Sequence, residues 1–205
     1  MPGRPLDEYE SKTLLSRHGL NVPRMSKLDG GVEGIEYPVA LKAVSADIKH
    51  KTEAGAVVLD IGSEEELMIE ARLMRERLPG VELMAEEMVP AGLEAIIGVV
   101  DDPTFGRVIM VGLGGTLAEL LADSAFRKLP IDARDAAEMV AELEHRALFG
   151  GFRGHPDVTD ELVRTLVAVS EVAEAEDITE MDLNPVVMNG SGAVIVDAKI
   201  SVSSE

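Results

Sequence analysis

Lys42 and His50 are the first residues whose types and positions suggest chemistry. They lie in the stretch Val39–Ile61, where two runs rich in Val, Ile and Leu flank a polar segment, a pattern that predicts strand, loop and strand. Lys42 falls inside the first predicted strand, and a buried ammonium loses its hydration unless an anion compensates it. Lys42 therefore either pairs with a carboxylate or binds a phosphate, and His50 in the loop could reach the same anion. The simpler alternative is an ion pair and an ordinary surface loop.

A second group of candidates lies near the end of the sequence, where residues 178–198 have the pattern of a β-hairpin with its turn at Asn189–Gly192. Paired strands would bring Asn184 and Asp197 close together, so that both side chains could share one ligand. Two further carboxylates precede Asn184 on the same predicted strand, at Glu180 and Asp182. A lone aspartate on a strand is usually solvated or hydrogen-bonded. An oxygen-rich group of this kind instead suits Mg²⁺, which binds a few protein oxygens together with nucleotide phosphates and water.

The sequence of 205 residues is acidic, with 19 Lys and Arg against 38 Asp and Glu and a net charge of −19. Nucleic acids and anionic membranes bind net basic surfaces, so we expect neither as a partner. An acidic protein that binds an anionic ligand must gather its few basic side chains locally. This scarcity adds Lys49, Lys51 and Arg127 to Lys42 as candidates. Most of the acidic excess could equally reflect solubility or a salty environment.

Composition excludes several other kinds of site. The absence of cysteine removes disulfides, thiolate metal sites and a cysteine nucleophile, and it favours a reducing cytoplasm. No apolar run approaches the ~18 residues of a membrane helix, and the N-terminal residues lack the hydrophobic segment of a signal peptide. We therefore expect a soluble, cytoplasmic protein. Its 46% hydrophobic content can build the core of one large domain or of two small lobes.

The elements that must hold these residues are strands interrupted by helices. After an irregular start, helices are predicted from Asp7 to Gly19, Ser63 to Leu78, Asp132 to about Leu143 and Asp157 or Thr159 to about Ala173. Further strands are predicted at residues 22–28, 82–89, 94–100 and 107–111, with an extended segment at 126–131. The loop Gly112–Gly115 indicates phosphate binding only weakly, because glycines also serve turns and bulges.

Nine separated motifs occur between about Leu6 and Ile200: Pro38–Lys42, Asp47–Thr52, Glu87–Val89 with Gly92 and Glu94, Phe105–Gly106, Gly112–Gly115, Asp123 with Phe126–Arg127, Arg153–Gly154, Glu180–Pro185 and Val196–Ala198. In this order they resemble the ATP-grasp beta subunits of the ADP-forming acetyl-CoA synthetases. The resemblance implies an α+β fold of the ATP-grasp type, in which two lobes with mixed or antiparallel sheets and flanking helices close on a nucleotide.

The resemblance also implies a domain organisation. Residues 1–205 would form a single ATP-grasp domain, with a first lobe at about 20–88 and a second lobe at about 89–205. The N-terminal helix at residues 6–19 would pack on the second lobe. Members of the family usually place a helix where this sequence has only Asp29–Glu36, a stretch too short for a full one. This departure affects packing at the edge of the first lobe rather than the chemistry.

The cofactors implied by the resemblance are ATP or ADP and Mg²⁺. The nucleotide-binding residues would be Lys42 for the phosphates, Glu87, Met88 and Val89 for the adenine through backbone groups, and Glu94 for the ribose. Asn184 and Asp197 would bind Mg²⁺. These implied roles agree with the chemistry inferred above for Lys42 and for the hairpin pair.

For catalysis, His50 matches the histidine of the family's His-Lys-Ser/Thr motif and would carry a phosphoryl group. Lys42, Arg127 and Mg²⁺ would neutralise charge during its transfer. The implied enzyme is an acid–thiol ligase, an ADP-forming acetate–CoA ligase, which interconverts acyl-CoA, ADP and phosphate with a carboxylic acid, CoA and ATP. A separate alpha subunit would carry the CoA-binding and ligase domains, which this sequence lacks.

Two alternatives remain open from the sequence. The beta subunit of succinyl-CoA synthetase shares the fold and a similar metal-binding strand, but the His-Lys-Thr segment near Lys42 favours the acetyl type. The other alternative is a regulatory module that binds a nucleotide without turnover. The presence of both Lys42 and the pair Asn184 and Asp197 argues against it, because a degenerate module should have lost at least one of them.

Overall fold

The structure, a computed structural model, describes residues 3–30, 32, 34–45, 55–115, 121–189 and 192–203. The chain divides into two compact units. The large unit contains Met1–Leu6, Glu10–Val22 and Pro90–Glu205, and the small unit contains Asp7–Tyr9 and Pro23–Val89. Within the described ranges, no helix has the length and apolar character needed to cross a membrane.

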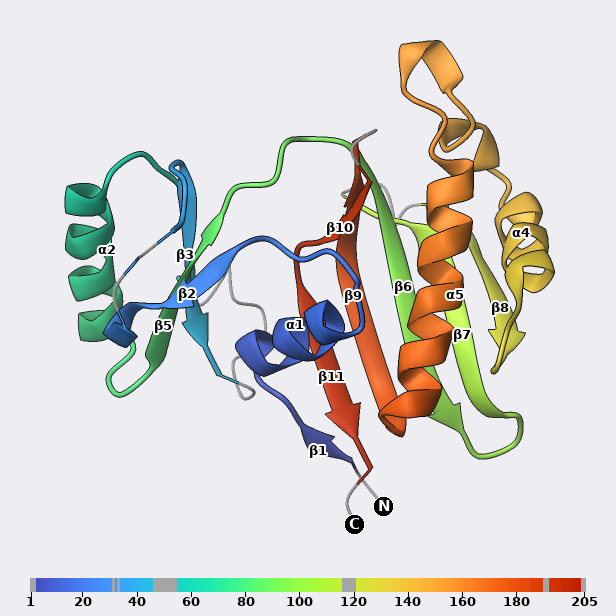
Figure 1. Cartoon of the computed structure of the whole chain (residues 1–205), viewed down its shortest axis with the longest axis horizontal. Coiled ribbons are helices and arrows are strands. Elements are labelled where there is room, and N and C mark those ends of the chain that lie inside the picture. Colours follow the sequence, from blue (N-terminus) through green and yellow to red (C-terminus); the bar gives the residue numbers. More distant parts are fainter. Residues whose placement is uncertain are drawn as a thin grey trace. The chain divides into compact units, whose positions relative to one another are not determined.

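A seven-stranded antiparallel sheet is the framework of the large unit (Figure 1). Its strands lie in the order β1, β11, β9, β6, β7, β8, and β10 also pairs with β9. Their bounds are β1 (Arg4–Pro5), β6 (Leu93–Asp102), β7 (Gly106–Leu113), β8 (Ser124–Lys128), β9 (Ile178–Met188), β10 (Ala193–Ile195) and β11 (Ala198–Val202). The long strand β9 is central, because β6 pairs with one of its edges and β10 and β11 with the other.

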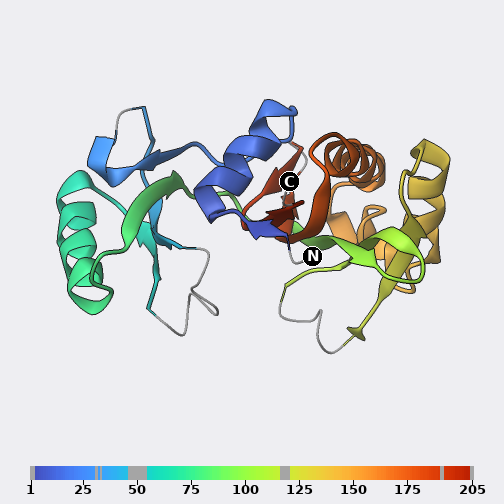
Figure 2. The ribbon, with the colours of Figure 1, turned by 90° about the horizontal axis from the view of Figure 1, so that it is seen from below.

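The helices α4 (Ala133–Glu142) and α5 (Thr159–Ala175) lie on the same face of this sheet (Figure 2). Successive residues of a strand point to opposite faces. Ile97, Ile109 and Leu183 are buried in one core with apolar residues of both helices. The alternate residues of the same strands therefore form the opposite face of the sheet.

Three other helical segments are described in or partly in the large unit. They are α1 (Glu8–Arg17) and the 3₁₀ turns η2 (Arg146–Leu148) and η3 (Phe152–Gly154). Leu15 of α1 is fully buried in the large-unit core, whereas the first residues of this helix, Glu8 and Tyr9, belong to the small unit.

An aspartate side chain binds the backbone at the start of both α4 and α5. Asp132 forms the predicted cap of α4, because its carboxylate accepts the N–H of Asp135 at 2.9 Å and the Asp135 carboxylate accepts the N–H of Asp132 in return. In α5 the prediction is corrected by one residue. The N-cap is Val158, and the Asp157 carboxylate accepts the N–H of Thr159 at 3.0 Å.

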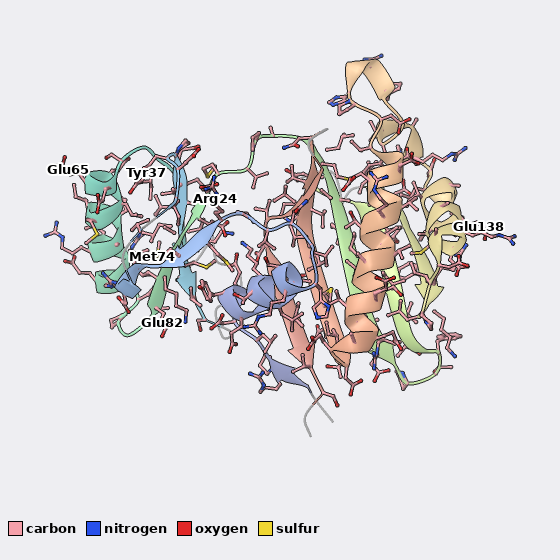
Figure 3. All side chains as sticks on the ribbon, in the orientation of Figure 1. Arg24, Tyr37, Glu65, Met74, Glu82 and Glu138 are labelled. Atoms are coloured by element: carbon pink, nitrogen blue, oxygen red, sulfur yellow. The ribbon has the colours of Figure 1, made fainter. Side chains whose placement is uncertain are left out.

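The small unit consists mainly of a four-stranded antiparallel sheet with one helix on it. The strand order is β2, β5, β3, β4, with bounds β2 (Met25–Lys27), β3 (Val39–Val44), β4 (Val57–Ile61) and β5 (Glu82–Glu87), and a 3₁₀ turn η1 (Leu28–Gly30) follows β2. The helix α2 (Glu64–Arg77) packs through Leu67, Ala71 and Met74, of which Met74 is labelled in Figure 3. Its predicted N-cap, Ser63, accepts the N–H of Glu66 at 3.2 Å.

The α+β class and the antiparallel sheets are confirmed, and the differences from the predicted elements are local. In the described residues before α1, Arg4–Pro5 forms the strand β1 against the end of β11, where an irregular segment was predicted, through backbone bonds that need no side-chain pattern. The extended segment predicted at 126–131 begins earlier, as β8. The single returning strand predicted at 193–198 is two strands, β10 and β11, with Val196 and Asp197 between them.

Candidate functional site

The face of the large sheet opposite α4 and α5 carries the polar residues of β9. Met181 and Leu183 point into the core, so the alternating residues Glu180, Asp182 and Asn184 lie on the other face. Figure 2 shows α4 and α5 together on one side of the sheet, and the buried residues of β9 belong to the core that these helices share. Neither of these two helices therefore separates the three side chains from a ligand.

Asn184 and Asp197 are neighbours, as the hairpin pattern predicts. The N–H of Asn184 donates to the carbonyl oxygen of Asp197 at 3.2 Å, and the N–H of Val196 donates to the carbonyl oxygen of Pro185 at 3.0 Å. The Asn184 side chain is exposed, and Asp197 is half-buried. Opposed residues on antiparallel strands share a face. The side-chain amide of Asn184 and the carboxylate of Asp197 therefore lie on the same side of the sheet.

Asp182 is the most perturbed carboxyl group near this pair. It lies between Gly98 of β6 and Lys199 of β11. Burial raises the pKa of Asp182, the positive charge of Lys199 opposes that effect, and the negative charges of Asp197 and Glu180 add to it. The sequence placed Asp182 beside the pair without giving it a role, because its burial depends on how β6, β9 and β11 come together.

We expect the substitution Asp182→Asn to raise the melting temperature at pH 7. Because the pKa of Asp182 is raised in the folded state, the folded chain keeps a proton that the unfolded chain has already lost as the pH rises above the usual carboxyl range. Ionised Asp182 therefore lowers stability at neutral pH, and asparagine removes that cost. Thermal melts from pH 3 to pH 7 measure the effect, and the gain should vanish at pH 3. A variant that is less stable than the natural chain at pH 7 would contradict this assignment.

A divalent cation at this place would have few protein ligands. In the described part of the chain, no three His, Cys, Asp or Glu side chains gather closely enough to hold a metal. Asn184 and Asp197 supply two oxygen ligands, and Mg²⁺ commonly fills its other positions with phosphate oxygens and water. The pair therefore fits Mg²⁺ that arrives with a nucleotide better than a cation held by protein groups alone.

Glu94, the residue expected at the ribose, lies against the glycine-rich turn at the end of β7. The N–H of Gly114 donates to the carbonyl oxygen of Glu94 at 2.7 Å. A Cβ atom on Gly114 would meet the Glu94 backbone at 2.9 Å, and one on Gly115 would meet the Glu94 Oε2 at 2.7 Å. Gly115 also has a φ of +75°. Close approach to Glu94 thus explains these glycines, without requiring that they bind phosphate.

We expect Gly115→Ala to weaken nucleotide binding as well as stability. Its left-handed backbone should cost about 1–2 kcal/mol of unfolding free energy. The new Cβ would also displace the Glu94 carboxylate, so binding of ADP should weaken about tenfold, the size of one hydrogen bond to a charged group. Calorimetry with Mg-ADP and thermal melts measure the two effects.

Gly19→Ala is the matched control for Gly115→Ala. Gly19 has a φ of +81°, but a Cβ there meets no atom within 4 Å. This variant should lose similar stability and bind ADP normally. If Gly115→Ala also binds ADP normally, Glu94 does not contact the nucleotide in the expected way.

Lys42, in the small unit, lies inside β3 and is only 5% exposed. Its Nζ atom lies 2.6 Å from Glu86 Oε1 and 2.8 Å from Glu8 Oε1, and both carboxylates are almost fully buried. Of the two alternatives for Lys42, the structure thus shows the pairing with carboxylates. Glu8 and Glu86 are not among the residues that the sequence pattern singled out. The available signal was the charge of Glu86 directly after the apolar run Leu83–Ala85.

In the segment Glu87–Val89, which is expected at the adenine, two of the backbone N–H groups already donate hydrogen bonds within the small unit. The N–H of Glu87 donates to the carbonyl oxygen of Arg24 at 2.9 Å, and that of Met88 to the carbonyl oxygen of Pro38 at 3.1 Å. Among the residues that the structure describes, the half-buried Val89 has no partner for its N–H. Adenine has ring nitrogens that accept hydrogen bonds. Val89 is therefore the residue of this segment whose N–H can donate a hydrogen bond to adenine.

The side chain of Glu87 holds the short connection Asp29–Glu36 in place. Glu87 Oε1 accepts the N–H of Glu36 at 2.9 Å and lies 3.1 Å from the guanidinium of Arg24, which is labelled in Figure 3. Arg24 also donates to the carbonyl oxygen of Gly34 at 3.3 Å. In the described part of this connection, the only helical segment is the turn η1, and these contacts hold the residues that follow it.

Arg127 lies on the helix-covered face of the large sheet, together with the buried Ala125. Its guanidinium binds Glu142 of α4, with Nη1 3.0 Å from Oε2 and Nη2 2.5 Å from Oε1. The structure therefore does not bring Arg127 together with Asn184 and Asp197, which lie on the opposite face. The physical reason is strand alternation, which the sequence alone does not connect to a face of the sheet. One turn earlier in α4, Glu138 (Figure 3) pairs with Arg134 at the surface.

His50 lies outside the described residues, as do its neighbours Lys49 and Lys51. The predicted phosphoryl-carrying role therefore stays a prediction from the sequence. The described chain resumes at Gly55, two residues before β4.

A family model described as an ATP-grasp domain matches residues 3–202 of this chain. The beta subunit of acetate–CoA ligase (ADP-forming) II from Pyrococcus furiosus is 41% identical, over 94% of this chain and 89% of that protein. Acetate–CoA ligase (ADP-forming) II from Archaeoglobus fulgidus is 37% identical over 95% of this chain, but over only 30% of its own length. The chain thus spans less than a third of the longer relative and about nine-tenths of the Pyrococcus subunit.

A solved structure with the same fold is an acetyl-coenzyme A synthetase 1 of Candidatus Korarchaeum cryptofilum. Its matching chain has a TM-score of 0.85 and 36% identity, with 97% of this chain and 93% of that chain covered. That protein was solved with coenzyme A and Mg-AMPPCP, and its phosphohistidine segment points towards the nucleotide-binding site.

Proposed function

Because the chain belongs to the ATP-grasp domain family and, within it, to the beta subunits of ADP-forming acetate–CoA ligases, we propose that it binds Mg-ATP and Mg-ADP for an acyl-CoA synthetase. The reaction interconverts acyl-CoA, ADP and phosphate with a carboxylic acid, CoA and ATP. The observation that carries the proposal is that Asn184 and Asp197 lie opposite each other in the backbone pairing, where their side chains would supply two oxygen ligands to Mg²⁺.

In this proposal the large unit binds the metal and the ribose. Asn184 and Asp197 hold Mg²⁺, which neutralises phosphate charge when it is bound. Asp182 lies beside the pair, and its carboxylate, once ionised, adds negative charge that favours a divalent cation there. Glu94, held by the turn at Gly114 and Gly115, accepts hydrogen bonds from the ribose hydroxyls.

The small unit supplies groups for the phosphates and the adenine. Lys42 contributes a positive charge for a phosphate oxygen, and the N–H of Val89 donates to the adenine ring. The Glu87 side chain keeps the connection Asp29–Glu36 in place rather than binding the base. Arg127 joins β8 to α4 through Glu142, so we assign it a structural rather than a catalytic role.

His50 would carry the phosphoryl group between the two subunits. Its imidazole nitrogen attacks phosphorus, a nitrogen–phosphorus bond forms, and the bond from phosphorus to its previous carrier breaks. In the direction of ATP synthesis, an oxygen of the terminal phosphate of ADP then attacks the same phosphorus and releases neutral His50. Imidazole suits this work because it titrates near neutral pH and forms no stable ester.

The partner in this proposal is an alpha subunit that carries CoA-binding and ligase domains. The match to a named beta subunit implies that a partner chain exists. The longer Archaeoglobus relative has room for such domains within one polypeptide, because this chain accounts for only 30% of it. A stable interface between the two chains should bury roughly 1,000 Å² or more.

Reconstitution tests the proposal. The purified chain should bind Mg-ADP in calorimetry but show no thiokinase activity by itself, and adding the alpha subunit should restore turnover. A panel of short acids that includes succinate separates the acetate-type enzyme from the succinate-type alternative. Nucleotide binding without any turnover in the complex would favour the regulatory module, and the full rate from the isolated chain would show the proposed division of labour to be wrong.

A further inference from the structure

Glu8 is a buried acid to which the proposed function gives no part. It is the first residue of α1 and is only 3% exposed. Its Oε1 accepts a hydrogen bond from Lys42 Nζ at 2.8 Å. We propose that Glu8 is a positioning residue that fixes the Lys42 ammonium for a nucleotide phosphate. This inference rests on the proposed function, in which Lys42 binds that phosphate.

Two carboxylates from different elements define the place of the Lys42 ammonium. Glu86 comes from β5, next to β3 in the sheet, and its Oε1 lies 2.6 Å from Nζ. Glu8 comes from a helix far away in the sequence. A lysine side chain has four flexible carbons, so a single partner leaves the ammonium free to turn about that contact. Two partners on separate elements restrict it to one position.

The surrounding charges explain why the carboxylates need not repel a phosphate. Lys12 follows Glu8 by one turn of α1 and is fully buried as well. Residues four apart on a helix lie on the same side of it. Glu8 thus has a second buried ammonium group near it on its own helix, in addition to that of Lys42, and these two positive charges offset its negative charge.

The first turn of α1 has a second anchor that does not depend on Glu8. The ring of Tyr9 lies 5.1 Å from Nζ of Lys27, in the geometry of a cation–π contact. A substitution at Glu8 should therefore leave this turn attached to the small unit. Loss of the Glu8 carboxylate should then be felt mainly at Lys42.

Calorimetry of the full chain with two probes tests the inference. Mg-ADP carries the phosphates that Lys42 would contact, and adenosine carries none. Glu8→Ala should weaken Mg-ADP binding about tenfold, as is typical when the partner that orients a ligating group is lost, and adenosine binding should not change. Glu8→Gln keeps an acceptor oxygen and should recover most of the affinity. Glu10→Ala, at an exposed position of the same helix, should bind both probes normally.

Several outcomes would overturn the inference. Glu8→Ala with normal Mg-ADP affinity would show that Glu86 alone suffices, and tighter binding would show that the Glu8 carboxylate competes with phosphate. Equal losses for Mg-ADP and adenosine would indicate a structural role only. If Glu8→Ala does not fold, Glu8→Asp replaces it, because a carboxylate one methylene shorter should also weaken Mg-ADP binding selectively.

A separate variant tests the premise about Lys42. If Lys42→Met binds Mg-ADP as tightly as the natural chain does, Lys42 does not bind the phosphate. This conclusion would hold whatever the Glu8 variants show. If the natural chain does not bind Mg-ADP at all, that result would instead contradict the proposed function. If Lys42→Met loses the phosphate-dependent affinity and Glu8→Ala does not, only the positioning role fails.

Discussion

Replacing Asp197 by alanine should lower turnover of the reconstituted enzyme by on the order of 10²-fold or more. The metal would lose its charged protein ligand and, with it, much of the stabilisation of charge on the transferred phosphoryl group. The hydrogen bond from the N–H of Asn184 to the backbone carbonyl of Asp197 does not use the replaced side chain and should persist in the variant. Titrating Mg²⁺ into mixtures of the variant with ADP should show that affinity for ADP no longer depends on the metal.

Two matched variants sharpen the Asp197 experiment. Asp197→Asn keeps the volume and one oxygen but removes the charge, so its loss should be smaller than that of the alanine variant. Asp101→Ala removes an exposed aspartate from β6 of the same sheet and should behave as the natural chain. If Mg²⁺ still strengthens ADP binding in Asp197→Ala as much as in the natural chain, Asn184 and Asp197 are not the metal ligands.

Replacing His50 by alanine should lower turnover by roughly 10³-fold or more, because no other group can replace a nucleophile that forms a covalent intermediate. The complex with the alpha subunit would be incubated with ATP labelled at the γ-phosphate. The chains would then be separated at alkaline pH, which preserves phosphohistidine. Label should appear on this chain and be absent from the His50→Ala variant.

His155→Ala is the control for this experiment, because His155 is exposed in the loop after η3. It should retain both label and turnover. Full activity of the His50→Ala complex would reduce His50 to a structural residue. Label that persists on the variant chain would show that a different residue accepts the phosphoryl group.

Much of the local structure could be predicted from the sequence, because it depends on residues close together in the chain. The caps at Ser63 and Asp132 each involve a residue within three positions. Asn184 and Asp197 are neighbours because of the register in which β9 pairs with the next two strands, β10 and β11. Strand ends were predicted less well, since backbone pairing at an edge, as in β1, leaves little trace in side-chain patterns.

The sequence by itself determined that Lys42 needs a buried anion and that Asn184 and Asp197 come together, because burial in a strand and hairpin pairing are local properties. Only the tertiary structure decided that the anions at Lys42 are the carboxylates of Glu8, 34 positions earlier in the sequence, and of Glu86, on the neighbouring strand β5. It also decided that Arg127 faces α4. In each case the partner lies on a different element, and the choice of face and partner is made by packing between elements, which no periodicity within one segment encodes.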